Sequence, residues 1–334
     1  MTQFEPPSKS GLILNTGAVG DCLLSLTLAT LLRDTYQLER VDFIGNTEYI
    51  EFYPGRTCID GVRSAESIPL HRLFADENEF VLEDKDRLQD AFAEYEHVVS
   101  FLGAGHPHFE QNLLFTLHST HSAQLTLIPT LPPADYPDHV TKFYQDRFQE
   151  ENQLEDLNFL PDMAVSPLPV DYISGTELLE EVDINSDDSV VIIQPGSGSA
   201  DKCWYWDNFL ETAARLKQDK YQVVFLLGPA EAERISPDRL ARLRATETVL
   251  ENLSLTHVLQ VLTQADLCLG NDSGICHLSA AMGKKTVVLF GPTNPEQYRP
   301  VGPSVHILTP SPASFHSTSD EEQTSIARTL LALL

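Results

Sequence analysis

Basic residues are scarce in this chain. Its 334 residues include 22 Lys and Arg against 49 Asp and Glu, which gives a formal net charge of -27. Such a chain repels nucleic acid and anionic lipid unless a local basic patch exists. The densest basic stretch, Arg234 to Arg244, is interrupted by acidic residues. The composition therefore argues against a protein that binds nucleic acid.

The chain also lacks a long apolar run and a paired cysteine pattern. No apolar run approaches the roughly 20 residues that a membrane-spanning helix needs. The five cysteines are scattered and form no Cys-x-x-Cys pair, which favours reduced thiols in a cytoplasmic protein. The first residues, MTQFEPPSKSG, are polar and acidic, so we expect no secretion signal.

Two nucleotide-binding motifs are incomplete. The segment 195–202, PGSGSADK, lacks the Gly-Lys-Ser/Thr ending of a P-loop, which makes NTP hydrolysis an unfavoured function. The turn at 15–21, NTGAVGD, lacks the third glycine of the dinucleotide fingerprint. A nicotinamide-dependent oxidoreductase is therefore the least favoured class.

What the chain does contain is an alternation of strand and helix patterns that starts twice. It begins with the buried strand pattern Gly11 to Leu14 and restarts at Val190 to Gln194, after a segment rich in proline and acid. We predict the α/β class, with two Rossmann-like doubly wound domains that face each other across a cleft. The expected domains are 1–175 and 176–315, and a terminal helix at 316–334 is expected to pack back on the N-terminal domain.

The most informative stretch is 267–295, LCLGNDSGICHLSAAMGKKTVVLFGPTNP. A strand pattern there leads through a tight turn into a helix. The residues that could carry chemistry at the start of this helix are Asp272, Ser273, Gly274 and His277. The N-terminus of a helix attracts anions through its unpaired N–H groups and its dipole. Asp272 could instead simply cap the helix. His277 and the later turn Gly291-Pro292-Thr293 favour a site for a diphosphate ester.

The loop after Gln194 offers further groups for phosphate oxygens. Ser197, Gly198 and Lys202 supply a hydroxyl, a flexible backbone and a cation; alternatively, Lys202 is an ordinary surface lysine. Glu231, after the next strand pattern, could accept hydrogen bonds from ribose hydroxyls, with Glu233 as an alternative.

The first turn holds a candidate general base. Gly20 would allow a ligand to approach the backbone, and Asp21 would take a proton from an attacking hydroxyl. The turn by itself favours the alternative, in which Asp21 caps the following helix.

Together these motifs resemble the heptosyltransferase family of inverting glycosyltransferases, glycosyltransferase family 9, whose fold is GT-B. The resemblance rests on Asn271-Asp272-Ser273-Gly274 with His277, on Gly291-Pro292-Thr293, on Ser197 with Lys202, and on Gly20-Asp21. It implies that 1–175 is the acceptor domain and 176–315 the nucleotide-sugar donor domain. It also implies that Asp21 is the catalytic base. Two positions depart from the family pattern, Asn15 and Ser100.

The function implied is transfer of a sugar, a heptose by resemblance, from a nucleotide diphosphate sugar such as ADP-heptose to a hydroxyl of a glycan or lipopolysaccharide-type acceptor. No metal or cofactor is expected. The alternatives are a catalytically silent nucleotide-sugar-binding protein and a nucleotide-sugar epimerase of related fold. A cytoplasmic location is expected, with weak peripheral contact at the inner membrane face left open.

Overall fold

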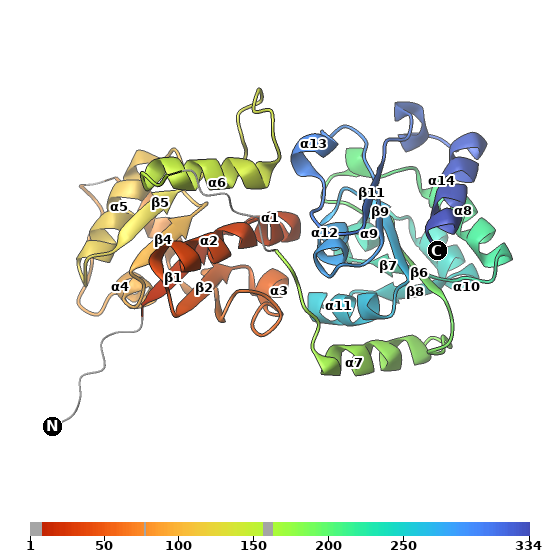
Figure 1. The fold of residues 1–334 in the computed structure, drawn as a ribbon, viewed down its shortest axis with the longest axis horizontal. Coiled ribbons are helices and arrows are strands. Elements are labelled where there is room, and N and C mark those ends of the chain that lie inside the picture. The colour runs from red at the N-terminus through yellow and green to blue at the C-terminus, as the bar shows by residue number, and fades with distance from the viewer. Residues whose placement is uncertain (1–8, 77, 156–162) are drawn as a thin grey trace. The chain divides into compact units, whose positions relative to one another are not determined.

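The computed structural model describes residues 9–76, 78–155 and 163–334, and these residues form two compact units. The first unit ends at Met163 and contains a parallel sheet in the order β3-β2-β1-β4-β5 (Figure 1). Its strands are β1 (Ser10–Leu14), β2 (Arg40–Gly45), β3 (Gly61–Ser64), β4 (His97–Ser100) and β5 (Gln124–Leu127). Its helices are α1 (Val19–Leu24), α2 (Leu26–Tyr36), α3 (Thr47–Ile50), α4 (Arg87–Phe92), α5 (Pro107–His118) and α6 (Val140–Glu151).

The second unit, from Ala164 to Leu334, contains a parallel sheet in the order β11-β10-β9-β6-β7-β8. Its strands are β6 (Val190–Gln194), β7 (Gln222–Leu227), β8 (Thr248–Glu251), β9 (Leu267–Asn271), β10 (Thr286–Leu289) and β11 (Val305–Leu308). Its helices are α7 (Pro169–Glu180), α8 (Trp206–Gln218), α9 (Pro229–Arg234), α10 (Pro237–Thr246), α11 (Leu255–Thr263), α12 (Gly274–Ala281), α13 (Pro295–Tyr298) and α14 (Asp320–Leu333).

Burial explains why the central strands form where they do. Every residue of β1, β6 and β9 is buried, because helices cover both faces of each parallel sheet. The edge strands β3, β8 and β11 are only half-buried along their length. The two sheets and their helices confirm the predicted α/β class. In the described residues, no helix has the length and apolar character needed to cross a membrane.

Each sheet reverses its strand order next to its first strand. In the first unit the reversal lies between β1 and β4, and in the second between β6 and β9. Ligands of doubly wound sheets bind outside the carboxyl ends of the strands at this point. The loops that follow β1, β4, β6 and β9 are therefore the places to look for a site.

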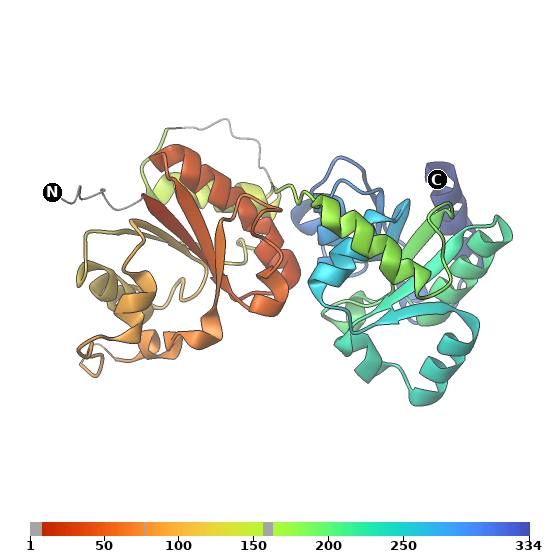
Figure 2. The same ribbon diagram turned by 90° about the horizontal axis from the view of Figure 1, so that it is seen from below.

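The division between the units falls before the expected boundary at 175. That boundary lies inside α7, which begins with Pro169 at its first turn and packs along α11 of the second unit (Figures 1 and 2). Gly175 explains the fit, because a Cβ there would stand 2.1 Å from the carbonyl oxygen of Gln260. Proline was interpreted as a linker signal, but proline is also favourable at the first position of a helix.

The terminal helix also lies elsewhere than expected. α14 packs against α8, and Ile326 and Leu330 belong to the hydrophobic core of the second unit (Figure 1). Packing on the N-terminal domain was expected from the sequence, but the apolar face of α14 completes the layer that α8 begins in the second unit.

Candidate functional site

The end of β9 and the loop after β6 are joined by a buried amide. The Asn271 side chain accepts a hydrogen bond from the N–H of Trp204 at 2.9 Å and donates to the carbonyl of Pro195 at 2.7 Å. Asn271 is fully buried. This pair of bonds holds residues 195–204 against the start of α12. In the sequence Asn271 stands out only as part of a motif, because its positioning role depends on residues that are distant in the chain.

Asp272 lies directly after this amide and is 6% exposed. Its Oδ2 accepts hydrogen bonds from Lys202 Nζ at 2.7 Å and from Thr293 Oγ1 at 2.8 Å. His277 Nε2 stands 3.9 Å from Oδ1, which is longer than a hydrogen bond. Burial by itself would raise the pKa of Asp272, but His277, Lys202 and Thr293 outweigh burial and lower the pKa to about 2. Asp272 is therefore an ionised carboxylate that orients a lysine.

The alternative interpretation of Asp272 as a helix cap is wrong. The cap of α12 is Ser273, whose Oγ accepts a hydrogen bond from the N–H of Cys276 at 3.5 Å. Ser273 Oγ also lies 2.8 Å from the side-chain amide of Gln194. Gly274 is the first residue of α12, and His277 follows one turn later, 7% exposed. Asp272 is thus available for a task that capping does not explain.

The loop after β6 is held from two sides. Ser197 is buried, and its hydroxyl donates to the backbone carbonyl of Asp272 at 2.6 Å. The guanidinium of Arg234 donates to the carbonyls of Ser197 at 2.7 Å and Gly198 at 3.0 Å. Arg234 could not be predicted for this role, since no local pattern links α9 to a loop so far away in the chain. A Cβ at Gly198 would meet nothing within 4 Å, so packing does not require glycine there.

Glu231 lies in the first turn of α9, just after β7, and is 8% exposed. Its Oε2 accepts a hydrogen bond from the N–H of Gly228 at 2.7 Å, which closes the first turn of α9. Its other oxygen lies under Gly196, where a Cβ would be only 1.5 Å away. The predicted contact with a ribose stays a prediction. The side chain of Glu233, the alternative, lies outside the described part of the chain.

The first unit contains the remaining predicted residues. Gly20 and Asp21 lie in the first turn of α1, and Asp21 Oδ2 accepts a hydrogen bond from the N–H of Ala18 at 3.1 Å. Asn15 is buried, donates to the carbonyl of Asp21 at 3.3 Å and accepts from the N–H of Gly17 at 2.9 Å. The N-cap of α1 is Ala18, and Asp21 contributes to capping from the third helical position by accepting from the N–H of Ala18. The polar turn holds Asp21 at the carboxyl end of β1.

Six of the predicted residues are thus brought together by one unit: Ser197, Lys202, Asp272, Ser273, Gly274 and His277. A buried carboxylate with its lysine, beside the N-terminus of α12, is an arrangement suited to a negatively charged group. Within the described residues, no group of three or more His, Cys, Asp or Glu side chains is placed to hold a metal ion.

The parallel sheets define a Rossmann-like protein, and comparison with known proteins assigns its family. The model of glycosyltransferase family 9 (heptosyltransferase) matches residues 132–325. The match covers more than half of the chain, so the protein belongs to this family.

Relatives of known sequence match over a shorter stretch. Lipopolysaccharide heptosyltransferase 1 of Pseudomonas aeruginosa is 35% identical over 132 residues, which is 39% of this chain and 36% of the relative. The matched stretch therefore spans about a third of the curated relative's length.

Several solved structures match over nearly the whole chain, and among them are two that belong to this family by name. The family 9 glycosyl transferase of Veillonella parvula has a TM-score of 0.72 at 14% identity, covering 97% of both chains. Escherichia coli heptosyltransferase WaaC with ADP has a TM-score of 0.67 at 16% identity, covering 97% of this chain and 100% of that one. At these identities the likeness concerns the fold, and it confirms the predicted GT-B fold class.

Proposed function

We propose that this protein is an inverting glycosyltransferase that moves a sugar from a nucleotide diphosphate sugar to an acceptor hydroxyl. The observation that carries the proposal is the buried Asp272 paired with Lys202 beside the N-terminus of α12. This pair lies at the strand-order reversal, where doubly wound sheets take their ligands. Family membership points to heptose as the sugar, and the ADP in the matching WaaC structure points to ADP-heptose as the donor.

The proposed reaction is a single displacement. The acceptor hydroxyl attacks the anomeric carbon, and the bond from that carbon to the diphosphate oxygen breaks. Asp21 accepts the proton of the hydroxyl. Lys202 and the first N–H groups of α12 stabilise the charge that develops on the departing diphosphate. Asp272 accepts a hydrogen bond from Lys202 and holds the ammonium in place, and the ammonium compensates the charge of the carboxylate.

The acceptor follows from the same family membership. The curated relative is a lipopolysaccharide heptosyltransferase, so we propose a glycan or lipopolysaccharide-type acceptor. A lipid-linked acceptor would place the protein at the inner membrane face. Contact with anionic lipid would be weak there, because the formal net charge is -27.

The test of donor binding is calorimetric titration with ADP, UDP, GDP and ADP-heptose, with and without Mg²⁺. We expect binding of ADP and ADP-heptose that does not depend on Mg²⁺. Lys202→Ala should weaken this binding by at least about ten-fold, or ~1.4 kcal/mol. Lys217→Ala is the matched control, since Lys217 pairs with Glu247 away from this site. Binding of UDP or GDP alone would mean that the donor carries that nucleotide and not ADP. No binding of any of these nucleotides would refute the proposal.

A catalytically silent binding protein is the second candidate. It is favoured by the capping bond between Asp21 and Ala18, which gives Asp21 a structural task. Both candidates bind the donor, so only product formation separates them. Release of ADP that requires an acceptor, measured together with the mass of the glycosylated product, supports the transferase.

A further inference from the structure

A concavity of the second unit lies beside the loop at 195–204, whose carbonyls accept hydrogen bonds from Arg234. It has a volume of about 420 Å³ and is bounded by the loop after β6, the starts of α8 and α10, and the 3-10 turn at Pro312–Phe315. Gly196 and Glu231 form the wall that it shares with the loop. Its size falls within the range of small-molecule pockets, roughly 300 to 1,000 Å³. None of the residues assigned to the diphosphate, Lys202, Asp272 or His277, lines it.

Flat apolar surfaces form most of the interior. Trp206, Tyr205, Phe315 and Ile235 line the cavity. The ring of Trp206 is held by Phe225, with 6.1 Å between the ring centroids. Trp204, also in the wall, is fixed by a hydrogen bond from its Nε1 to Ser314 Oγ at 3.0 Å. Rigid aromatic walls of this kind are suited to a planar ring, which can stack on them.

Two guanidinium groups reach the same cavity in a chain that is otherwise poor in cations. Arg234 is held by the carbonyls of Ser197 and Gly198. A guanidinium has five N–H donors, so Arg234 can donate further hydrogen bonds to a ligand. Arg239 Nη2 stands 3.7 Å from Asp207 Oδ2, with both side chains more than a third exposed. An exposed pair at this distance is weak and can be exchanged for another anion.

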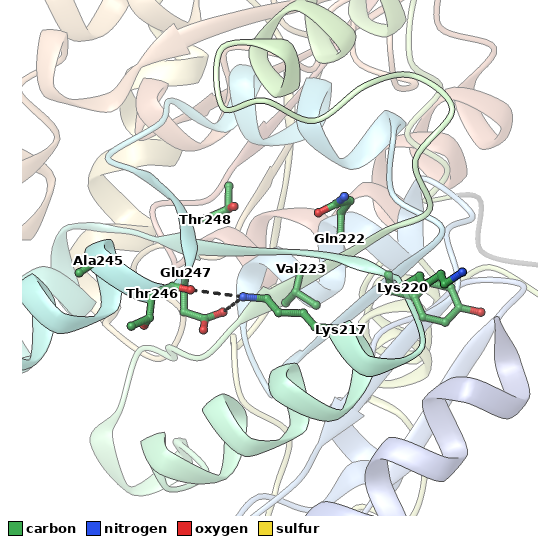
Figure 3. Close-up of a pocket in the computed structure, with 9 residues that line it drawn as sticks. Lys217, Lys220, Gln222, Val223, Ala245, Thr246, Glu247 and Thr248 are labelled. Atoms are coloured by element: carbon green, nitrogen blue, oxygen red, sulfur yellow. Dashed lines mark hydrogen bonds and ion pairs between the residues drawn. The ribbon is translucent and has the colours of Figure 1, made fainter.

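A hollow at the opposite end of the strands contains cations in a different setting. It lies beside the first residues of β7 and β8, and it contains Lys217 and Lys220 (Figure 3). Lys217 is paired with Glu247 at 2.6 Å, and Lys220 lies apart from both (Figure 3). Tyr221 also lines this hollow, but both of its cations are lysines, and one of them is already paired with a carboxylate.

We propose that the cavity of Arg234 and Arg239 is a second ligand site for a planar aromatic anion, beside the groups proposed for the diphosphate. Its ligand would stack on Trp206 and Tyr205 and place a phosphate, carboxylate or sulfonate against Arg239. Its wall contains Glu231, the predicted ribose contact, but none of the charged groups proposed for the diphosphate, so Lys202→Ala tests the two sites separately.

The chain's two tryptophans, Trp204 and Trp206, both line this cavity, which makes fluorescence a direct test. The probe is 8-anilinonaphthalene-1-sulfonate, an aromatic anion, with energy transfer from tryptophan as the readout and AMP as the competitor. We expect Arg239→Ala to weaken probe binding at least ten-fold. Arg242→Ala, an exposed arginine of the same helix outside the cavity, should leave it unchanged. Lys202→Ala should also leave it unchanged.

The outcomes separate the alternatives. Displacement by AMP would identify a nucleotide as the ligand type, and Arg239-dependent binding without displacement would support an aromatic carboxylate or sulfonate. Binding that is equally weakened by Arg239→Ala and Arg242→Ala would overturn the proposal. So would binding lost only in Lys202→Ala, which would place the probe in the donor site, and so would a lack of binding by both compounds.

Discussion

Asp86 in the first unit and Asp272 in the second are both buried carboxylates whose pKa is lowered to about 2. Asp86 reaches this state through two hydrogen bonds from Arg72, at 2.9 and 2.8 Å, and it caps α4 by accepting from the N–H of Leu88. Asp272 caps nothing and lies at the end of a central strand. A lowered pKa therefore marks a paired carboxylate, and only its place in the sheet distinguishes a structural pair from a candidate site.

The largest expected effect concerns a third carboxylate, Asp21. The proposed reaction assigns proton transfer to it, and it also accepts a hydrogen bond at the start of α1. Asp21→Asn keeps an oxygen for the N–H of Ala18 but cannot accept the proton. We expect transfer to fall by about 10² to 10⁴-fold with unchanged ADP affinity. The assay is acceptor-dependent ADP release, with calorimetry on the same preparation. Wild-type activity in this variant would leave Asp21 with its capping role alone.

The second-largest effect should distinguish the roles of Asp86 and Asp272, and it is expected when the cation of each pair is removed. Arg72→Ala leaves Asp86 buried without its partner, so the first unit should lose roughly 3 kcal/mol of stability while ADP affinity stays the same. Hydrogen exchange of the α4 amides measures this loss, since both tryptophans lie in the second unit. Lys202→Ala is the comparison and should mainly weaken ADP binding. A loss of ADP affinity in Arg72→Ala would contradict the structural role of the first pair.

The pH dependence tests what the two carboxylates have in common. A pKa lowered from 3.8 to about 2 means that Asp272 stabilises the fold above its unfolded pKa and loses this contribution as the pH falls towards 2. Asp272→Asn should cost roughly 2 kcal/mol at pH 7, and the difference from wild type should shrink between about pH 4 and pH 2. Thermal unfolding across this range measures it, with the exposed Asp201→Asn as control. A difference that is independent of pH would contradict the assigned ionisation.

The smallest expected effect distinguishes the two residues that compete for the cap of α12. Ser273→Ala removes the bond to the N–H of Cys276 and should lower stability by about 1 kcal/mol. Differential scanning calorimetry is sensitive enough for this change. An unchanged melting temperature would mean that Ser273 does not cap the helix in solution.

The central elements could be predicted from sequence because burial leaves a local pattern. β6 was expected at the bounds that the structure has, since its residues are mostly apolar and all of them are buried. β3, β8 and β11 were missed. Their residues are half-buried at the sheet edges, and a short mixed segment carries neither a continuous apolar run nor a clear alternation.

The site was predicted in part for a similar reason. Asp272, Ser273 and His277 belong to one turn and one helix start, so their proximity follows from sequence spacing. Asn271 and Arg234 act across more than thirty residues, on the loop at 195–204. No local pattern distinguishes a buried amide or a guanidinium that will hold a remote loop from one on the surface.

By itself the sequence determined the class of the fold, the positions of the buried strands and the local order of the donor-type motif, because periodicity and turn chemistry are properties of neighbouring residues. Tertiary structure alone decided that Ser273 caps α12, that Lys202 pairs with Asp272, and that α14 packs on α8. Those outcomes depend on which strand ends and helix faces come into contact when the helices pack on the parallel sheet.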